Sequence, residues 1–299
     1  MTGYEIGRTD TAQTPHTDVL DRTDLHGVRL VATDIDGTLL RSDYTISDRA
    51  RRAIARAADA GLVVVFVTGR PPRWLDEIGA MTGHVGVAVA ANGAVTYDLA
   101  AGEVLDAHAL TPELVAEVTA ALRHSFPNVA FGLEYGLHFG HEPHYRHDWE
   151  ISPTHDRAGN PIDPPAVGPI GEIGRQPAVK LLAKDRGADA DEFLAAASEI
   201  LHGRATVTHS SKSALLEISA LGVTKATGLQ KVADQHGIRP DEVAAVGDMP
   251  NDLPMLVWAG HSFAVGNAHP TVLAAASTVL DSNDDDAVAQ LIEAVLRDR

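Results

Sequence analysis

The order of apolar and polar residues predicts a chain that alternates between buried strands and amphipathic helices in its first and last parts. Continuous apolar runs, rich in β-branched residues, are typical of parallel strands that are covered on both faces. Such runs occur at 28–33, 62–70, 86–94, 243–248 and 262–266. The helix after the first run has Ser47 as its predicted N-cap and Gly61 just beyond its end. Strands separated by helices of this length indicate right-handed βαβ units and a parallel sheet.

Between about 97 and 212 the pattern changes to short strands in pairs. Residues 95–107 predict a hairpin, a helix follows with Thr111 as its N-cap, and the segment 150–177, rich in proline and glycine, predicts a long loop. Further strands are predicted around 132–140 and at 177–185, 204–209 and 214–219, with a helix at 189–201. Paired strands with two helices favour an antiparallel sheet that has its helices on one face.

Together these patterns predict an α/β chain with a doubly wound, Rossmann-like parallel sheet and an inserted α+β domain. We expect residues 1–26 to be a polar, disordered N-terminal extension. The core domain is predicted to comprise 27–96 and 213–299, and the inserted domain to comprise 97–212.

Composition and charge narrow the classes of function. The 299 residues carry a formal net charge of −17, which argues against a nucleic-acid partner. No cysteine is present, so a metal would be held by oxygen or imidazole. No apolar run is long enough to span a membrane, and the N-terminus lacks the features of a signal peptide. We expect a cytoplasmic monomer or homodimer with no membrane partner.

Polar groups and glycines follow four of the predicted strands. They are Asp34 and Asp36 after the first, Thr68, Gly69 and Arg70 after the second, Asn92 and Gly93 after the third, and Asp248, Asn251 and Asp252 after the strand at 243–248. Lys225 begins a helix of the same domain and is one of only five lysines. Because the carboxyl ends of parallel strands meet at one edge of a sheet, we expect these groups to lie close together. Arg70 is equally compatible with a surface arginine at a helix start and is not included in the catalytic set.

Two carboxylates as close as Asp34 and Asp36 repel each other unless a positive charge lies beside them. An oxygen-only acidic site suits Mg²⁺, which takes few protein ligands and leaves positions for water and phosphate. Asp34 is then a candidate nucleophile. Asp36, on the same side of an extended segment, is a candidate general acid and base. Thr68 and Lys225 are suited to bind a phosphoryl group.

These motifs resemble those of a known family. DIDGTL, the threonine of VTGR, the lysine of GVTKATGL and the segment GDMPNDLPML are similar to the four ordered motifs of the haloacid dehalogenase-like phosphohydrolases. The insertion after the second motif, with Asn92-Gly93-Ala94 and Gly266-Asn267-Ala268, resembles the Cof-like branch with the larger α/β (type IIB) cap. The resemblance covers about 28 to 299, and one departure is Ala226, where the family usually has glycine.

The resemblance implies a role for each matched residue. Asp34 would become phosphorylated, and Asp36 would be the acid and base while its carbonyl binds the metal. Asp248 would be the third metal ligand, and Asp252 would orient a metal-bound water or the lysine. The predicted phosphate or substrate ligands are Thr68, Lys225, Gly69, Asn92, Gly93 and Asn251. The implied activity is a Mg²⁺-dependent phosphatase of small phosphorylated metabolites, with sugar phosphates as one possibility.

A histidine-rich segment within the inserted domain is the candidate specificity element. His138, His141, His144 and His147 recur at every third residue, which is not the spacing of a helical zinc pair. A metal site, a structural role and contact with substrate are all compatible with this pattern. We interpret Glu134, His141 and Tyr145 as residues that face the active-site cleft and contact the substrate.

Two other functions fit part of the sequence. A sugar phosphomutase shares this core and cap type, but it must hold a bisphosphate and would need a more basic cap. A non-catalytic ligand-binding protein on the same scaffold is disfavoured because every expected catalytic residue is present.

Overall fold

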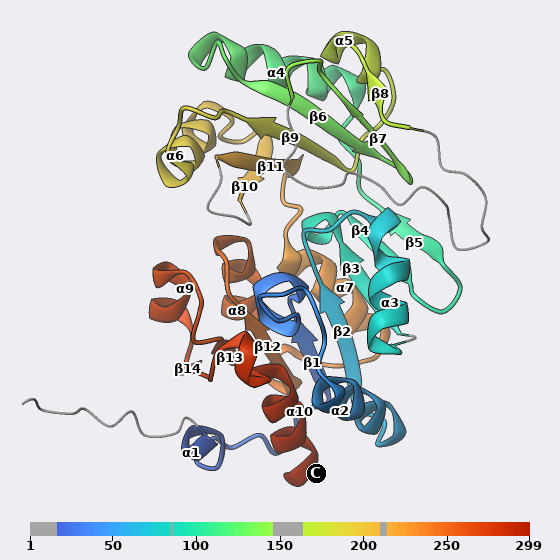
Figure 1. Ribbon diagram of the computed structural model, residues 1–299, viewed down its shortest axis with the longest axis vertical. Coiled ribbons are helices and arrows are strands. Elements are labelled where there is room, and N and C mark those ends of the chain that lie inside the picture. Colours follow the sequence, from blue (N-terminus) through green and yellow to red (C-terminus); the bar gives the residue numbers. More distant parts are fainter. Residues whose placement is uncertain (1–16, 85, 146–163, 210–213) are drawn as a thin grey trace, which may run out of the picture.

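The chain folds into two β-sheets, each with its own helices, and the smaller sheet lies above the larger one (Figure 1). The computed structural model describes residues 17–84, 86–145, 164–209 and 214–299. The larger sheet has eight strands in the order β14-β13-β12-β1-β2-β3-β4-β5. These strands are β1 (Leu30–Thr33), β2 (Val63–Val67), β3 (Val87–Ala90), β4 (Val95–Asp98), β5 (Glu103–Ala107), β12 (Val243–Gly247), β13 (His261–Ala264) and β14 (Thr278–Val279).

The six strands from β14 to β3 are parallel, as the apolar runs predict, and every residue of β1 and β12 is buried. The helices that accompany this sheet are α2 (Asp48–Asp59), α3 (Leu75–Thr82), α7 (Lys225–Gln235), α8 (Leu253–Trp258), α9 (Pro270–Ala275) and α10 (Ala287–Arg297). Helix α2 packs against α10, and α7 packs against α8. The predicted cap of α2 is confirmed, because the hydroxyl of Ser47 accepts a hydrogen bond of 2.9 Å from the backbone N–H of Ala50.

The smaller sheet has six strands in the order β10-β11-β9-β6-β7-β8. These are β6 (Ala130–Tyr135), β7 (His138–His141), β8 (Ala166–Val167), β9 (Lys180–Lys184), β10 (Ala205–Thr208) and β11 (Leu215–Ala220). Helices α4 (Pro112–Ser125), α5 (Ile170–Ile173) and α6 (Ala190–Ile200) accompany it, and α4 and α6 share an apolar core with its strands. The opposite face of this sheet is turned toward the larger sheet (Figure 1). The doubly wound α/β core with an inserted α+β unit is therefore as predicted. We call this inserted unit the cap.

The strands are not divided between the two sheets at the predicted boundaries of 97 and 212. The hairpin of β4 and β5 extends the larger sheet by antiparallel pairing, and β11 belongs to the smaller sheet. A strand pattern shows that a segment is extended, but it does not show which sheet the segment joins. We propose instead that the cap begins after Ala107 and ends after Ala220.

Two segments that were predicted to lack regular structure contain some. Within the predicted extension 1–26, residues 1–16 lie outside the described part of the chain, but 17–26 are ordered and include α1 (Thr17–Leu20). Leu20 and Leu25 are buried in the main core, which explains why this short segment is held in place. The predicted loop 150–177 likewise contains β8 and α5 in its described part.

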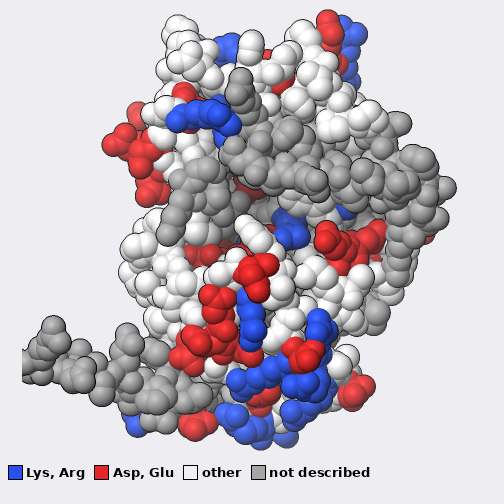
Figure 2. Space-filling view, viewed as in Figure 1, with Lys and Arg blue, Asp and Glu red and all other residues white. Residues whose placement is uncertain are grey.

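Charge is unevenly distributed over the surface. Figure 2 shows basic side chains gathered over α2, at the lower end of the molecule. That helix carries Arg49, Arg51, Arg52 and Arg56. Arg49 pairs with Glu293, and Arg51 pairs with Asp48. The patch is thus partly neutralised by acids that lie beside it. Among the described residues, no helix combines the length and the apolar character needed to cross a bilayer.

A histidine is buried where α3 returns to the larger sheet. The ring of His84 lies 4.6 Å from that of Phe66, and its Nε2 is 3.0 Å from the carbonyl oxygen of Val64. Because a carbonyl only accepts, Nε2 carries the proton. Burial lowers the pKa of His84, although the bond to Val64 partly opposes the shift. The native protein therefore holds a neutral imidazole here.

This burial predicts a loss of stability in mild acid. Below the ordinary histidine pKa the unfolded chain takes up a proton that native His84 does not, so the free energy of unfolding falls as the pH falls. The slope is at most about 1.4 kcal/mol per pH unit for one proton. We expect His84→Gln, which can still donate to Val64 but cannot titrate, to lose less stability between pH 7.5 and 5. Urea unfolding across this range measures the difference, and parallel curves for the two proteins would contradict the assignment.

Candidate active site

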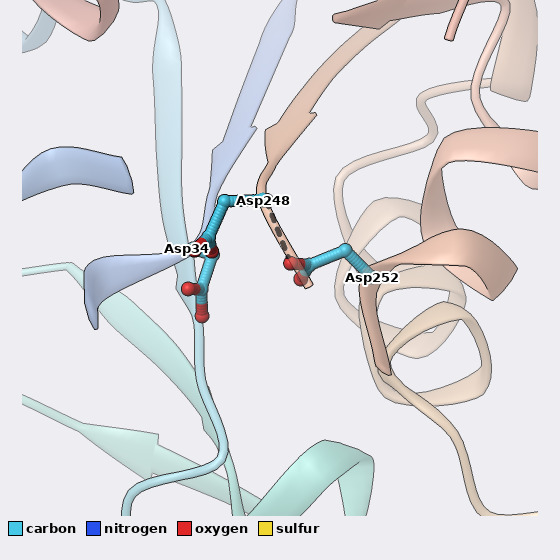
Figure 3. Close-up of side chains that lie close together, drawn as sticks. All are labelled: Asp34, Asp248 and Asp252. Carbon is cyan, nitrogen blue, oxygen red and sulfur yellow. Dashed lines mark hydrogen bonds between the residues drawn. The ribbon is translucent and has the colours of Figure 1, made fainter. Parts of the chain in front are cut away.

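Three aspartates meet at the carboxyl edge of the larger sheet. Asp34 follows β1, Asp248 follows β12, and Asp252 lies on the next turn, before α8. All three are buried, and one carboxylate oxygen of each lies within 4.8 Å of the others. Figure 3 shows these side chains converging from three different segments. The predicted meeting of acids at this edge is therefore observed.

Lys225 provides the positive charge within this cluster. Its Nζ donates to Asp34 Oδ1 at 2.5 Å and to Asp252 Oδ1 at 2.6 Å, and the residue is only 1% exposed. Helix α7 starts at Lys225 because Thr224 caps it, with a reciprocal bond to Thr227. Ala226, which stands where the resembled family usually has glycine, does not disturb the start of this helix, and its side chain packs against the main core. The lysine is thus held between two of the acids by the start of its own helix.

Asp252 is already engaged by protein groups. Its Oδ1 accepts from Lys225, and its Oδ2 accepts from the backbone N–H groups of Asp248 and Met249, at 3.0 Å each. The dashed line in Figure 3 is the bond to Asp248. A carboxylate that accepts three hydrogen bonds has little capacity left for a cation. The donor set therefore suits a divalent ion between Asp34 and Asp248, with Asp252 orienting its neighbours.

The electrostatics of the cluster favour an added cation. Burial raises the pKa of Asp34 well above its ordinary value, and the charges of Asp252 and Asp248 add to this, while Lys225 opposes it. Burial and the charge of Asp252 raise the pKa of Asp248 to about 7. Burial lowers the pKa of Lys225, but its two carboxylate partners outweigh this, so the net shift is upward. One ammonium does not balance three buried carboxylates, and a divalent cation would.

The turn after β1 is shaped to admit Asp248. Gly37 has φ of 75°, and a Cβ on it would lie 2.5 Å from Asp248 Oδ2. Thr38 Oγ1 donates to Asp248 Oδ1 at 3.1 Å, and Asn267 Nδ2 donates to the Gly37 carbonyl at 2.8 Å. The DIDGTL motif therefore needs glycine at this position because a side chain would displace the acid.

A strained loop after β3 brings Asn92 to the same edge. Ala91, Asn92 and Gly93 all have positive φ, of 49°, 57° and 102°. This conformation costs about 1 kcal/mol or more for a residue with a Cβ. A Cβ on Gly93 would lie 1.9 Å from the Thr224 carbonyl oxygen, so the loop presses against the start of α7. Thr68, which is fully buried, accepts the N–H of Asn92 through its carbonyl at 3.0 Å.

The sequence predicted that Asp36 would lie with the other acids, but in the structure it is not part of the cluster of Asp34, Asp248 and Asp252. Its two carboxylate oxygens accept from Arg70, at 2.7 Å to Nε and 2.5 Å to Nη2. The expectation assumed an extended segment from 34 to 36, whereas Ile35–Leu39 form a helical turn in which only Asp36 and Gly37 depart from helical φ and ψ. Of the two interpretations of Arg70, the surface one does not hold, because its side chain is 15% exposed and lies against Asp36, the predicted acid and base.

The cap makes three polar contacts with the core at this edge that the sequence did not identify. Glu134 on β6 forms an ion pair with Arg73 of the core, with both side chains almost fully buried. Lys180 on β9 pairs with Glu217 on β11 at 2.8 Å and also donates to the Gly69 carbonyl. The remaining contacts run through amides: Asn92 donates to Glu217 at 2.8 Å, and Asn251 donates to Asn92 at 3.0 Å. The sequence signal that could have indicated these contacts is Lys180, a charged residue inside the apolar run PAVKLLAKD.

The other cap candidates form an aromatic group beside Arg73. The rings of Phe139 and His141 lie 5.6 Å apart, and those of Phe139 and Tyr145 lie 5.9 Å apart. The guanidinium of Arg73 lies 5.3 Å from the centroid of Phe139. His141 and Tyr145 are therefore placed where the cap meets the core, whereas His147 lies outside the described residues.

Comparison with known proteins agrees with these observations. Residues 31–292 match the family model of the haloacid dehalogenase-like hydrolases. The chain is 29% identical over 287 residues to the 5-amino-6-(5-phospho-D-ribitylamino)uracil phosphatase YwtE of Bacillus subtilis (strain 168), covering 90% of this chain and 98% of that protein. It is 28% identical over 269 residues to the pyridoxal phosphate phosphatase YbhA of Escherichia coli (strain K12), covering 88% and 97%. Its fold resembles that of the subclass IIB sugar phosphatase BT4131, with a TM-score of 0.70, 21% identity and coverage of 89% and 98%.

The pairing of Arg70 with Asp36 predicts a measurable effect on turnover. Arg70→Met removes both hydrogen bonds that hold the Asp36 carboxylate, so we expect kcat for an aryl phosphate to fall about 2- to 13-fold, equivalent to about 0.5 to 1.5 kcal/mol. Arg70→Lys, which can keep one bond, should lie between. Arg49→Met is the matched control, because Arg49 makes the same two-point contact with Glu293 on the far side of the core. Steady-state kinetics measures the effect, and equal kcat values for the Arg70→Met and Arg49→Met variants would refute a role for Arg70.

Proposed function

This chain belongs to the haloacid dehalogenase-like hydrolases, in their Cof-like branch, and on that premise we propose that it hydrolyses small phosphorylated metabolites through a phosphorylated intermediate on Asp34. The reaction class, hydrolysis of a phosphoric monoester, is that of its family relatives. The observation that carries the mechanism is the buried contact of Lys225 with Asp34 and Asp252, beside Asp248.

The first step of the proposed mechanism is attack on the substrate phosphorus. An oxygen of Asp34 forms the new P–O bond, and the bond to the leaving alcohol breaks. Asp36 gives its proton to the leaving oxygen. Lys225 holds Asp34 in place, and Thr68 binds the transferred group. For Asp36 to act in this way one of its two oxygens must leave Arg70 during the cycle, while the bond to the other oxygen keeps the carboxyl in position.

The second step regenerates the enzyme. Water attacks the phosphorus of the intermediate, Asp36 takes a proton from this water, and the bond to Asp34 breaks to release inorganic phosphate. A bound Mg²⁺ would be held by Asp34, Asp248 and the main-chain carbonyl of Asp36. Its chemistry is to neutralise charge on the phosphoryl oxygens.

We further propose that the cap recognises the part of the substrate beyond the phosphate. The core residues that surround Asp34 can bind a phosphate but have no means to distinguish one phosphomonoester from another. His141 and Tyr145 belong to the aromatic group at the junction of cap and core, which supports contact with a ring or with hydroxyl groups. Glu134 remains a candidate, although its carboxylate is bound to Arg73. The two relatives are named for different phosphorylated compounds, which agrees with a cap that sets the substrate.

Removal of the nucleophile tests the covalent mechanism. Asp34→Asn keeps the size of the side chain but removes its charge, and we expect release of inorganic phosphate from an aryl phosphate to fall to background while the fold is kept. Fluoroberyllate, a phosphoryl mimic, should give a bound ¹⁹F signal with the wild type and none with the variant. If the variant kept more than about one-tenth of the wild-type rate, the activation free energy would have risen by less than about 1.4 kcal/mol. Such a result would disprove nucleophilic attack by Asp34. A phosphomutase would instead move phosphate between positions without releasing it.

Removal of the metal tests the cation site independently. We expect EDTA to abolish hydrolysis and Mg²⁺ to restore it, whereas excess Ca²⁺ should inhibit, because Ca²⁺ prefers more ligands and a looser geometry. Mg²⁺ should also raise the Tm of the wild type, because it binds the native state alone. Asp248→Asn should lose this shift, and Asp284→Asn, a surface control bonded to Ser42, should keep it. Full activity in metal-free buffer would exclude the proposed role of Mg²⁺.

A further inference from the structure

A buried ion pair of the cap rests directly on the phosphate-binding loops of the core. The side chains of Lys180 and Glu217 are 3% and 7% exposed, and their charged atoms are 2.8 Å apart. The ammonium of Lys180 also donates to the carbonyl of Gly69, next to Thr68. Burying two charges costs several kcal/mol each, so such a pair adds little net stability. This pair instead connects the cap to two loops of the core.

The carboxylate of Glu217 determines how two core amides are oriented. Its Oε2 accepts from Asn92 Nδ2 at 2.8 Å, and because a carboxylate only accepts, the amide nitrogen of Asn92 must face it. The oxygen of Asn92 then faces Asn251 and accepts from its Nδ2 at 3.0 Å. A reversed amide at either residue would place two acceptors or two donors against each other.

The end of this chain of hydrogen bonds is a free acceptor. Asn251 is 5% exposed, and its Oδ1 has no hydrogen-bond partner among the described residues. An unpaired buried polar atom is unfavourable, and it is a group that a bound ligand would satisfy. Its position on the turn between Asp248 and Asp252 places it at the active site. A hydroxyl or a protonated phosphate oxygen is the kind of donor that it would accept.

We propose that Glu217 of the cap, held in place by Lys180, is a positioning residue of the phosphate site, which orients the amides of Asn92 and Asn251 when the cap lies against the core. This inference deepens the proposed function and rests on it. The close approach that it requires is present, since a Cβ on Gly69 would lie 3.2 Å from Asn92 Oδ1 and 3.3 Å from Glu217 Oε2. The phosphate site is thus complete only with the cap in contact.

The test uses a charge-neutral substitution of similar size. Glu217→Gln leaves one carbonyl oxygen for two donors, Lys180 and Asn92, so Asn92 loses its partner or turns over. The matched control is Asp191→Asn. Asp191 is also an acid of the cap that contacts the core, since its Oδ2 lies 3.7 Å from His269 Nε2, but it contacts neither Asn92 nor Gly69. Both variants weaken contact of the cap with the core, and only the first alters the amide chain.

Inhibition by orthophosphate measures the effect on the phosphate site alone. We expect the inhibition constant against aryl phosphate hydrolysis to rise about 2- to 13-fold in Glu217→Gln, the loss of one positioned hydrogen bond. In Asp191→Asn it should change less than about 2-fold, because an exposed ion pair contributes little. Equal changes in the two variants would overturn the proposal, since they would mean that cap contact in general, and not Glu217, supports the site.

A spectroscopic readout separates this inference from the proposed activity. In ¹⁵N–¹H spectra the side-chain amide of Asn92, assigned by its loss in Asn92→Asp, should lie downfield because it donates to a carboxylate. It should move upfield in Glu217→Gln and stay in place in Asp191→Asn. An unmoved signal in Glu217→Gln would refute positioning by Glu217. This measurement needs no turnover, so a wild type that releases no phosphate would refute the proposed function and leave the positioning result standing.

Discussion

The structure depends on how one buried ammonium is placed among three buried carboxylates. Lys225 is held between Asp34 and Asp252, and Asp248 lies beside them with its pKa raised to about 7. Charges of one sign this close in a buried site are strongly unfavourable unless they are compensated. The lysine compensates in part, and the remaining negative charge makes this edge attractive to a divalent cation. The contact with Lys225 also favours the ionised form of Asp34, which is the form that can act as a nucleophile.

The backbone makes this arrangement possible at the end of a parallel sheet. Asp34 comes from the end of β1, whereas Asp248 and Asp252 come from the turn after β12, more than 200 residues along the chain, so the fold and not the local sequence brings them together. Gly37 admits Asp248, and Gly93 lets the loop of Asn92 press against the first turn of α7. Positive φ at Ala91 and Asn92 shows that the loop is held by its surroundings and not by local preference. Backbone strain and close packing therefore occur at the residues of the candidate active site.

The cap takes part in the site and does not only cover it. The buried contacts between Glu134 and Arg73 and between Lys180, Glu217 and Asn92 join the two sheets by polar groups. Polar contacts of this kind can be exchanged for water when the domains separate, whereas a large apolar interface could not. A cap attached in this way suits an enzyme that must admit substrate and then exclude water.

The sequence by itself determined the parallel core, the inserted α+β unit, and the set of acids with Lys225, because apolar periodicity and strand-end motifs are local signals. It could not determine which sheet takes β4, β5 and β11, because an extended segment shows no partner. It missed the pairing of Arg70 with Asp36 and the contact of Glu217 with Asn92, which is 125 residues away along the chain. Only tertiary structure decides such pairs, since burial and the hydrogen bonds that it demands are set by the whole fold.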